Sequence, residues 1–506
     1  MQFITGTNRR EGGIPYKWLV VIVVIFGSFM SILDQTVVNN ALPRLQTAFG
    51  VDFNSLQWVI TAYTLTQGVV TPTTAFFANR LGTKRFYVIA LAFFTLGSAL
   101  CGIAWNLPSL ILFRVVQAIG GATLFPLAIT LLFTEFPPQQ RGLATGILSV
   151  SALMAPAIGP TFGGYIVTYA DWPLIFYINV PVGIIAIVMA LLLLREHTSA
   201  SRVYFDLPGF VFAAIGLTAI LYAISNATIS GWSSPYIILT LIGGLCALLL
   251  FVFIELNTSR RGKQPLVDVR LFANGPFLSS NIANALISFG FFGSLILFPI
   301  YTQELRGLDA FQSGLLTLPL PFTAVLAAII GGRIVDRFGP RVVLFPGLVF
   351  MGLSTWQLAL ITPTTSYTWF LLILALRGLG LGCLLQPLTV SALAKVPQSQ
   401  YAQASSLNTV IRFVFTSLGI AILATVVQSR ATVYTSDLAH QVGLTSHATL
   451  ALIKQQGLNL ALHDAFWLAL VAFLVAFLAV GFIRVQKQRP QVKDAALEPA
   501  AQIVSE

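Results

Sequence analysis

The chain has 506 residues, of which 56% are hydrophobic and only 9% are charged, with a formal net charge of +11. Soluble globular proteins carry about 25% charged residues, so this composition excludes a water-soluble fold, a disordered chain and a disulfide scaffold. The positive charge does not indicate a nucleic-acid partner, because in a membrane protein the informative quantity is where Lys and Arg fall. We therefore expect an all-α integral membrane protein with many spans.

Fourteen apolar runs are long enough to cross a bilayer, which takes about 20 residues each. In chain order they cover residues 18–41, 56–78, 86–105, 109–133, 143–168, 174–194, 208–226, 235–256, 276–300, 314–335, 342–361, 368–393, 404–427 and 465–485. The connectors are short, except for segment 428–464 before the last run. No small-residue cleavage site follows the first run, so we expect an uncleaved first span.

The distribution of basic residues predicts the orientation. If both termini lie inside, inner segments hold 21 of the 28 Lys and Arg residues and outer segments hold 4. Cytoplasmic loops carry this excess in membrane proteins, so both termini are expected in the cytoplasm.

An internal repeat divides the chain. Asn79-Arg80-Leu81-Gly82 after the second run recurs as Asp336-Arg337-Phe338-Gly339 after the tenth. The fourth run carries Arg114, and the twelfth carries Arg377 at a nearly equal offset. The repeat predicts two six-helix halves around a midplane site, as in alternating-access transporters. We expect the halves at residues 18–194 and 257–486. A linker with two inserted helices is expected at 195–256, and cytoplasmic segments at 1–17 and 487–506.

Four stretches carry a family pattern. Leu33–Pro43 matches L-D-x-T-[IV]-V-N-x-A-L-P, and Ala75–Arg85 matches G-x-L-A-D-R-x-G-R-[RK] with departures. Arg114–Ala122 matches R-x-x-Q-G-x-G-A-A, and Ala155–Gly164 matches G-x-x-x-G-P-x-x-G-G. Segment Asp171–Gly183, with Phe176, Asn179 and Pro181, also fits. The chain thus resembles the major facilitator superfamily, in its fourteen-span drug:proton antiporter branch of the EmrB/QacA type.

Asp34 is the candidate proton-coupling residue. It lies 15 residues after Leu19, about 22 Å along a helix that crosses a ~30 Å core. We expect it to be the only acid deep inside a span, because Glu135 and Glu255 fall at cytoplasmic span ends that water reaches. Polar residues on one side of its helix predict a wet cavity. The alternative is a structural Asp34 that only hydrogen-bonds neighbouring helices.

Arg114 is expected at the same depth as Asp34, where the two could interact directly or through water. A purely structural buried arginine with carbonyl partners is the alternative. The remaining candidates for the substrate cavity share polar or charged side chains within spans: Ser31, Gln35, Asn39, Gln117, Arg377, Gln386, Asn408 and Arg412. Three arginines against one deep acid would make the interior net positive. That argues mildly against a dedicated cation exporter and leaves neutral, zwitterionic and anionic amphiphiles open.

Two loops are candidate gates, formed by Asn79, Arg80, Gly82, Lys84, Arg85 and Arg141 in the first half, and Asp336, Arg337 and Gly339 in the second. The resemblance implies that such loops latch the halves on the cytoplasmic side through the carboxylate. Asn79 replaces the usual Asp, which puts the first latch in doubt, and Arg141 is the expected partner of a carboxylate there. Positive-inside anchoring alone also explains the basic residues.

The antiporter motif supplies Ala155, Gly159, Pro160, Gly163 and Gly164. Small residues every four positions give a flat helix face for close contact. Packing alone explains that face as well as gating does. The resemblance implies that it lies against the other half and limits proton leak.

The sequence predicts a proton-coupled antiporter of the cell (inner) membrane that exports amphipathic drug-like compounds. The alternatives are an exporter of one metabolite or lipid-like compound, or an uptake symporter. The sequence lacks the ATP-binding motif G-x-x-x-x-G-K-[ST], so ATP is not the expected energy source. No cofactor or metal site is indicated, and the spans carry no cluster of catalytic residues that an enzyme would need. The expected partners are small amphipathic molecules, protons and the lipid bilayer, without nucleic acid. Segment 428–464 is a candidate lid or contact with a periplasmic or outer-membrane partner.

Overall fold

The computed structural model describes residues 15–51, 53–169, 171–196, 205–261, 265–442 and 447–483, and the regular secondary structure within these ranges is helical. The first part comprises α1 (Tyr16–Phe49), α2 (Phe53–Leu56), α3 (Trp58–Val70), η1 (Thr71–Thr73), α4 (Thr74–Leu81), α5 (Thr83–Gly102), α6 (Leu107–Glu135), η2 (Pro138–Gln140), α7 (Arg141–Tyr169), α8 (Leu174–Tyr177) and α9 (Asn179–Leu193). Helices α10 (Leu207–Ser230) and α11 (Pro235–Arg260) follow.

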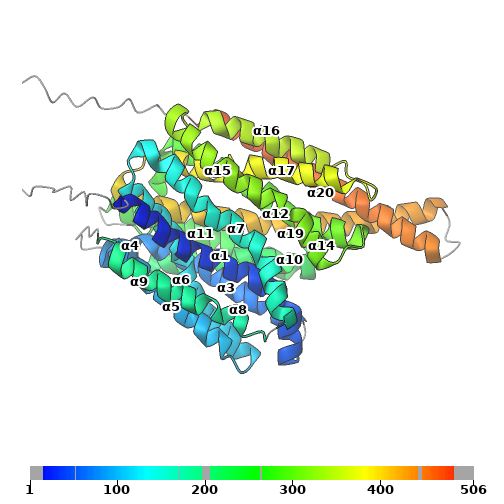
Figure 1. Cartoon of the computed structure of the whole chain (residues 1–506), viewed down its shortest axis with the longest axis horizontal. Helices are drawn as coiled ribbons and strands as arrows, with labels where there is room; N and C mark the ends of the chain where they lie inside the picture. Colours follow the sequence, from blue (N-terminus) through cyan, green and yellow to red (C-terminus); the bar gives the residue numbers. More distant parts are fainter. Residues whose placement is uncertain are drawn as a thin grey trace, which may run out of the picture.

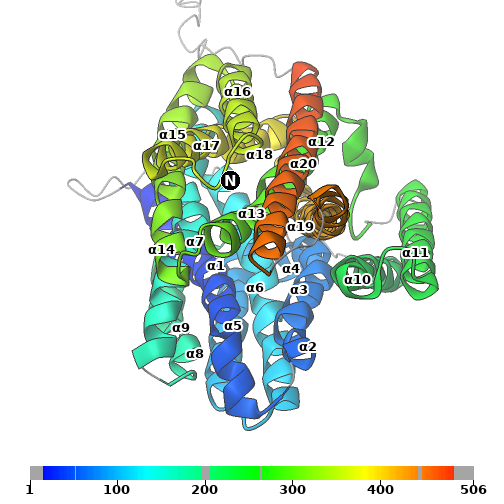
Figure 2. The same cartoon turned by 90° about the vertical axis from the view of Figure 1, so that its right-hand side faces the viewer.

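The second part comprises η3 (Val269–Ala273), α12 (Gly275–Leu295), α13 (Leu297–Pro299), η4 (Ile300–Leu305), α14 (Ala310–Thr317), α15 (Pro319–Phe338), α16 (Arg341–Leu358), α17 (Tyr367–Gly382), α18 (Leu385–Leu393), η5 (Gln398–Gln400), α19 (Tyr401–Val442) and α20 (His447–Gly481). The two parts form two bundles that lie side by side, as Figures 1 and 2 show from two directions. An apolar core with Phe291, Phe298 and Phe466 fills the second bundle.

Local sequence signals set several helix ends. Asn106 and Ser109 form a capping box at the start of α6, and Asp309 and Gln312 form another at α14. These side chains satisfy amide groups that a first helical turn leaves without partners. Capping matters here because the bilayer supplies no water for such groups.

Twelve helical segments of the described chain are long and apolar enough to cross a membrane. Two of the fourteen predicted spans are not among them. Run 56–78 is divided into α3, η1 and α4 at Pro72, which lacks the amide that a continuous helix needs. Run 143–168 corresponds to α7, a helix of 29 residues. The integral-membrane fold is confirmed, while the count of fourteen spans stays a prediction.

Helices α10 and α11 pack against each other at the side of the two bundles (Figure 2). A Cβ on Gly216 would lie 3.1 Å from the carbonyl oxygen of Gly244, so the two backbones approach closely. The outward face of α11 exposes large apolar side chains: Leu239, Ile242, Leu245, Leu249 and Phe253. That face suits contact with lipid.

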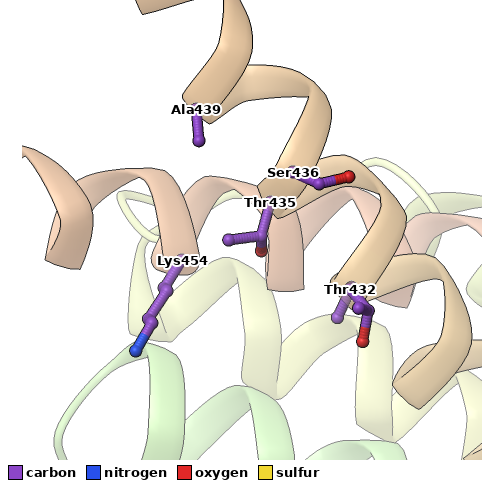
Figure 3. A pocket seen from close by; sticks show the side chains of 6 residues that line it. Thr432, Thr435, Ser436, Ala439 and Lys454 are labelled. Atoms are coloured by element: carbon purple, nitrogen blue, oxygen red, sulfur yellow. The ribbon is translucent and has the colours of Figure 1, made fainter. Parts of the chain in front are cut away.

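Segment 428–464 is mainly a continuation of two helices rather than a loop. Helix α19 has 42 residues and α20 has 35, and their ends project from the bundles as an antiparallel hairpin (Figure 1). Gly457 of α20 packs on Thr435 of α19. Figure 3 shows a hollow at this hairpin, lined by Ala431, Thr432, Thr435, Ser436 and Ala439 of α19 and by Lys454 of α20.

Candidate functional site

An ion pair between Asp34 and Arg114 lies deep in the first bundle. An Nη of Arg114 on α6 donates to a carboxylate oxygen of Asp34 on α1 at 2.5 Å. Each residue is only 1% exposed. Asp34 and Arg114 were expected at the same depth, and in the structure they are in direct contact.

Three further polar residues complete the Asp34 cluster, which we define as Asp34, Ser98, Arg114, Gln117 and Asn179. The side-chain amides of Gln117 and Asn179 each donate to the other oxygen of Asp34 at 2.8 Å. The same amides donate to Ser98 Oγ at 3.0 and 3.1 Å. Arg114 also donates to Gln117 Oε1 at 2.6 Å. The Asp34 carboxylate therefore joins α1, α6 and α9, and the two amides connect α5 to the cluster through Ser98.

Aromatic rings shield the pair from its surroundings. The guanidinium carbon of Arg114 lies 3.9 Å from the ring centre of Tyr63 on α3 and 5.8 Å from that of Phe176 on α8. Such faces attract a cation electrostatically. Within the described part of the chain, the hydrogen bonds to Asp34 come from N–H donors, which suits a carboxylate that only accepts.

The expectation of a wet cavity at Asp34 is wrong for this conformation, because packed polar and aromatic groups bury the carboxylate. Ser31 is 5% exposed, and the Gln35 side chain donates to its carbonyl at 3.4 Å. The side chain of Asn39 lies outside the described residues. Gln117 belongs to the Asp34 cluster rather than to a separate substrate cavity.

The other predicted cavity residues lie in the second half, in separate surroundings. Arg377 is fully buried and donates to Thr355 Oγ1 at 2.6 Å and to Ser294 Oγ. Asn408 donates to Asn281 Oδ1 at 3.1 Å, which links α19 to α12. Gln386 is 3% exposed, and its Oε1 has no hydrogen-bond partner. The structure therefore does not bring these residues together with Asp34.

Arg412 is half-buried on α19, at the boundary between the two bundles. Its guanidinium carbon lies 4.6 Å from the ring centre of Phe125 on α6. One helical face of α19 thus reaches the first bundle.

The two candidate gating loops share one backbone geometry. Gly82 ends α4 with a φ of 88°, and Gly339 ends α15 with a φ of 89°. Residues other than glycine rarely adopt such backbone angles. The sequence repeat therefore places a glycine at the same turn in both halves. The glycine pair is a structural counterpart of the repeat seen in the sequence.

Basic residues around these turns contact rings and backbone. Arg80 lies over the Phe76 ring at 5.8 Å, and Arg337 over the Phe338 ring at 5.2 Å. Lys84 Nζ donates to the Leu191 carbonyl at 2.7 Å. The first loop is held to the end of α9 by this bond and by Glu196.

Glu196 is a residue that sequence reasoning missed. Its carboxylate accepts the amides of Lys84 and Arg85, both at 3.2 Å, at the first turn of α5. Arg85 Nε lies 3.6 Å from the same carboxylate. No motif contains Glu196, although an acid just after a span is a weak signal for such capping.

Asp336 joins the two halves. Its carboxylate accepts the amides of Gly142 at 2.7 Å and Leu143 at 2.8 Å, at the start of α7. Arg141 instead donates to the carbonyls of Phe133 and Phe136 at 2.8 and 3.2 Å. The guanidinium carbon of Arg141 also lies 5.1 Å from the ring centre of Tyr401 on α19, so Arg141 contacts the second half through a ring and not through a carboxylate.

The antiporter-motif face packs within the first half, so the expected contact with the other half is wrong. Thr36 Oγ1 on α1 donates to the Ala155 carbonyl at 3.4 Å. A Cβ on Gly159 would lie 2.6 Å from Thr36 Cβ, and one on Gly163 would lie 3.3 Å from Val37 Cα. The α7 residues that face the other half lie nearer its start, where Gly142 opposes Gly332 of α15. The surroundings of Pro160 and Gly164 lie outside what the structure describes.

Glu255 is also placed differently from the expectation. It is 0% exposed rather than reached by water, and its Oε1 accepts the Val267 amide at 3.4 Å. Connector residues after α11 fold over the carboxyl group. Asp206, at the start of α10, is 3% exposed and close by.

Comparisons with known proteins identify the family. The model of the Major Facilitator Superfamily matches residues 24–205 and 207–420. An MFS-type transporter of Bacillus subtilis, YhcA, is 34% identical over 83% of this chain and 78% of its own length. A multidrug resistance protein B homolog of Mycobacterium tuberculosis is 32% identical over 79% of this chain and 74% of its own. The riboflavin transporter RibZ of Clostridioides difficile is 30% identical over 92% and 98%.

A solved structure shares the fold. The human organic anion transporter MFSD10 superimposes with a TM-score of 0.61 at 13% identity, over 91% of this chain and 100% of that chain. The family model covers most of the chain, and the relatives align over most of their own lengths. The chain therefore belongs to the major facilitator superfamily and is a multi-pass membrane transporter of small molecules, not an enzyme.

Proposed function

We propose that the protein is a proton-coupled antiporter that exports amphipathic drug-like compounds. The observation that carries this proposal is the Asp34 cluster, in which one buried carboxylate accepts hydrogen bonds from three side chains on two neighbouring helices, α6 and α9. Ionisable groups inside spans are costly and are functional by default. The relatives named as multidrug proteins support the substrate class.

Protonation of Asp34 would change what the cluster can hold. An ionised carboxylate accepts from Arg114, Gln117 and Asn179, whereas a protonated one loses the charge that attracts the guanidinium. Arg114 has another acceptor nearby, because its Nε lies 3.5 Å from the Val59 carbonyl of α3. A proton at Asp34 thereby favours a rearrangement of α1, α3 and α6. The protonated and the ionised protein would then favour two different conformations. If substrate binds to one and a proton to the other, the two move in opposite directions across the membrane.

The contact between Asp336 and α7 would close the cytoplasmic side in one of these states. A carboxylate at a helix N-terminus is stabilised by the free amides and by the helix dipole. Since the contact crosses from one half to the other, it must break when the halves separate. The proposed halves are residues 18–194 and 257–486, with α10 and α11 as an insert.

We further propose that the protein lies in the cell (inner) membrane with both termini in the cytoplasm. The bias of basic residues toward the inner segments supports this orientation. The hairpin of α19 and α20 would then lie outside, where a periplasmic or outer-membrane partner could reach it.

A second candidate is the transport of one specific metabolite. The relative named a riboflavin transporter, which is 30% identical over 92% of this chain, favours this alternative. A panel of chemically unrelated dyes separates the two candidates. Export of several dyes supports multidrug efflux, and export of a single compound class supports the alternative.

The test is proton-driven efflux in inverted vesicles, with Asp34→Asn beside the parent protein. Asparagine is nearly the same size and keeps hydrogen-bonding capacity, so folding should survive while coupling is lost. Arg114→Ala should also impair transport. Efflux with unchanged dependence on the proton gradient in a well-expressed Asp34→Asn protein would refute the assignment.

A further inference from the structure

The second bundle repeats the Asp34 cluster with its acid missing. Arg377 follows Arg114 by 263 residues, Thr355 follows Ser98 by 257, and Ser294 follows Asp34 by 260. In the structure Arg377 on α17 donates to Ser294 on α12 and to Thr355 on α16. Ser294 therefore contacts Arg377 where Asp34 contacts Arg114.

The charge of Arg377 is not neutralised by any described residue. Within the described chain no carboxylate lies within 4.0 Å of its guanidinium, and its Nε has no hydrogen-bond partner. Three phenylalanine rings surround it at 5.2 to 5.9 Å: Phe291, Phe298 and Phe473. The hydroxyls of Ser294 and Thr355 donate onward to backbone carbonyls, so they offer dipoles but no charge.

Arg412 is a second arginine of this kind, and it lies where the two halves meet. Among the described residues no acidic group lies within ion-pair distance of it, and its guanidinium faces the Phe125 ring of α6. On the same helix Ser405 donates to the Pro126 carbonyl of α6 at 3.2 Å. This part of α19 therefore lies against the first half, and Arg412 is half-buried at that boundary.

The two halves consequently differ in charge. In the first, Asp34 compensates Arg114, while in the second Arg377 and Arg412 remain uncompensated among the described residues. A guanidinium keeps its proton at neutral pH, and its field is weakly screened in a low-dielectric interior. A group that enters between the halves therefore meets a net positive potential from the second half.

We propose that this potential selects the substrate class, so that the transported compounds are amphiphiles that bear a carboxylate or sulfonate. Arg412 donates charge-assisted hydrogen bonds to the anionic group, and Arg377 adds a fixed positive field from within the second bundle. The inference rests on the proposed export function and adds to it the charge of the substrate. Cationic amphiphiles are disfavoured by the same field.

The experiment uses three dansyl compounds of different charge: dansylglycine (anionic), dansylamide (neutral) and dansylcadaverine (cationic). Their binding to the full-length protein in proteoliposomes is followed by dansyl fluorescence, and their efflux by loss of that signal. We expect dansylglycine to bind about tenfold tighter than dansylcadaverine, the ratio that one charge-assisted contact supplies. Equal binding of the two, or tighter binding of dansylcadaverine, overturns the proposal.

Two pairs of variants assign the preference to the named residues. Arg412→Gln should remove most of the preference for dansylglycine, whereas Arg412→Lys should keep it. Ser294→Asp places an acid beside Arg377 and should lower the preference for dansylglycine. Ser294→Asn, of similar size but neutral, should keep that preference. Arg430→Gln on the outer hairpin, where Arg430 pairs with Asp464 at 3.3 Å, removes a positive charge elsewhere and should leave the preference unchanged.

The outcomes separate this inference from the proposed export function. If dansylamide efflux depends on the proton gradient but charge has no effect on binding, the export function stands and the inference fails. If Ser294→Asp and Ser294→Asn lower the preference equally, the effect is one of packing and the role of Arg377 is refuted. Absence of gradient-dependent efflux for all three compounds, with dansylglycine still bound most tightly, refutes the export function alone.

Discussion

Asp336 of α15 caps α7 across the boundary between the two halves, with its carboxylate 2.7 Å from the amide of Gly142. Because this bond links elements from opposite halves, it contributes to the stability of one conformation relative to another, and not only to the stability of a helix. Two other contacts also cross between the halves: Thr130 Oγ1 of α6 lies 3.3 Å from Ser405 Oγ of α19, and Ser405 Oγ donates to the Pro126 carbonyl of α6 at 3.2 Å.

Loss of the Asp336 carboxylate should weaken this closed arrangement. Hydrogen bonds to a charged group contribute about 1.5–3 kcal/mol, so Asp336→Asn should shift the population toward the open state by at least several-fold. The measurement is disulfide formation between Thr130→Cys and Ser405→Cys, which the 3.3 Å contact of the parent side chains favours. An unchanged crosslinking rate in the Asp336→Asn background would show that the cap does not bias the two states.

Asn79→Asp should act in the opposite sense. Asn79 occupies the position in the first half that Asp336 occupies in the second, and α4 contacts α19. By the repeat, a carboxylate at residue 79 faces the first turn of α19, where an anion is stabilised by about 0.3–1 kcal/mol. The same Thr130→Cys and Ser405→Cys crosslink should form faster. A slower crosslink would contradict the repeat-based placement.

The proposed orientation predicts where the hairpin lies. In a chain whose three cysteines are replaced by serine, Ser436→Cys on α19 should react with an impermeant maleimide in intact cells. Arg260→Cys at the end of α11 should react only after permeabilisation. The opposite pattern would place both termini outside.

The antiporter-motif glycines should differ in their tolerance of a methyl group. A Cβ at Gly159 would overlap the Thr36 side chain, and such overpacking costs about 1–3 kcal/mol, whereas a Cβ at Gly163 needs only a small adjustment. Gly159→Ala should therefore lower the thermal unfolding temperature, and Gly163→Ala should change it little. If Gly159→Ala instead keeps its stability but leaks protons, the face is a gate and not only a packing surface.

Glu255 should tolerate an amide better than it tolerates truncation. Its Oε2 is buried without a hydrogen-bond partner, and Asp206 is its acidic neighbour. An unsatisfied polar group costs about 1–3 kcal/mol, so Glu255→Gln should keep or raise the unfolding temperature. Glu255→Ala should lower it, because the Val267 amide loses its acceptor. A strongly destabilised Glu255→Gln protein would indicate that the charge of Glu255 is required.

Much of the fold was predictable because a bilayer requires long apolar helices, and the sequence displays these as separate runs. The pairing of Asp34 with Arg114 was predictable from depth alone, since counting residues along two helices places both at one level. Depth does not determine how each helix is rotated. For that reason Asn179 and Ser98 were not recognised as partners of Asp34, although Asn179 lies in a segment that fitted the family pattern.

Other errors came from contacts between distant segments. Glu255 falls at a span end, where exposure is the ordinary outcome, but the connector around Val267 covers it. The face of Gly159 and Gly163 was placed against the wrong half, because small-residue spacing identifies a contact face without identifying its partner. In segment 428–464 low hydropathy ended the predicted spans, although helices can continue into water.

The length of α19 connects the inner side of the protein to the outer hairpin through one continuous helix. Its 42 residues form one helix of about 63 Å, which begins beside α4 and ends in the outer hairpin. A tilt of about 10° at its inner end would displace the far end by about 11 Å if the helix stays rigid. Asn408 and Arg412 lie in the first third of α19. If the helix stays rigid, a movement at the boundary between the bundles therefore also moves the tip of the hairpin.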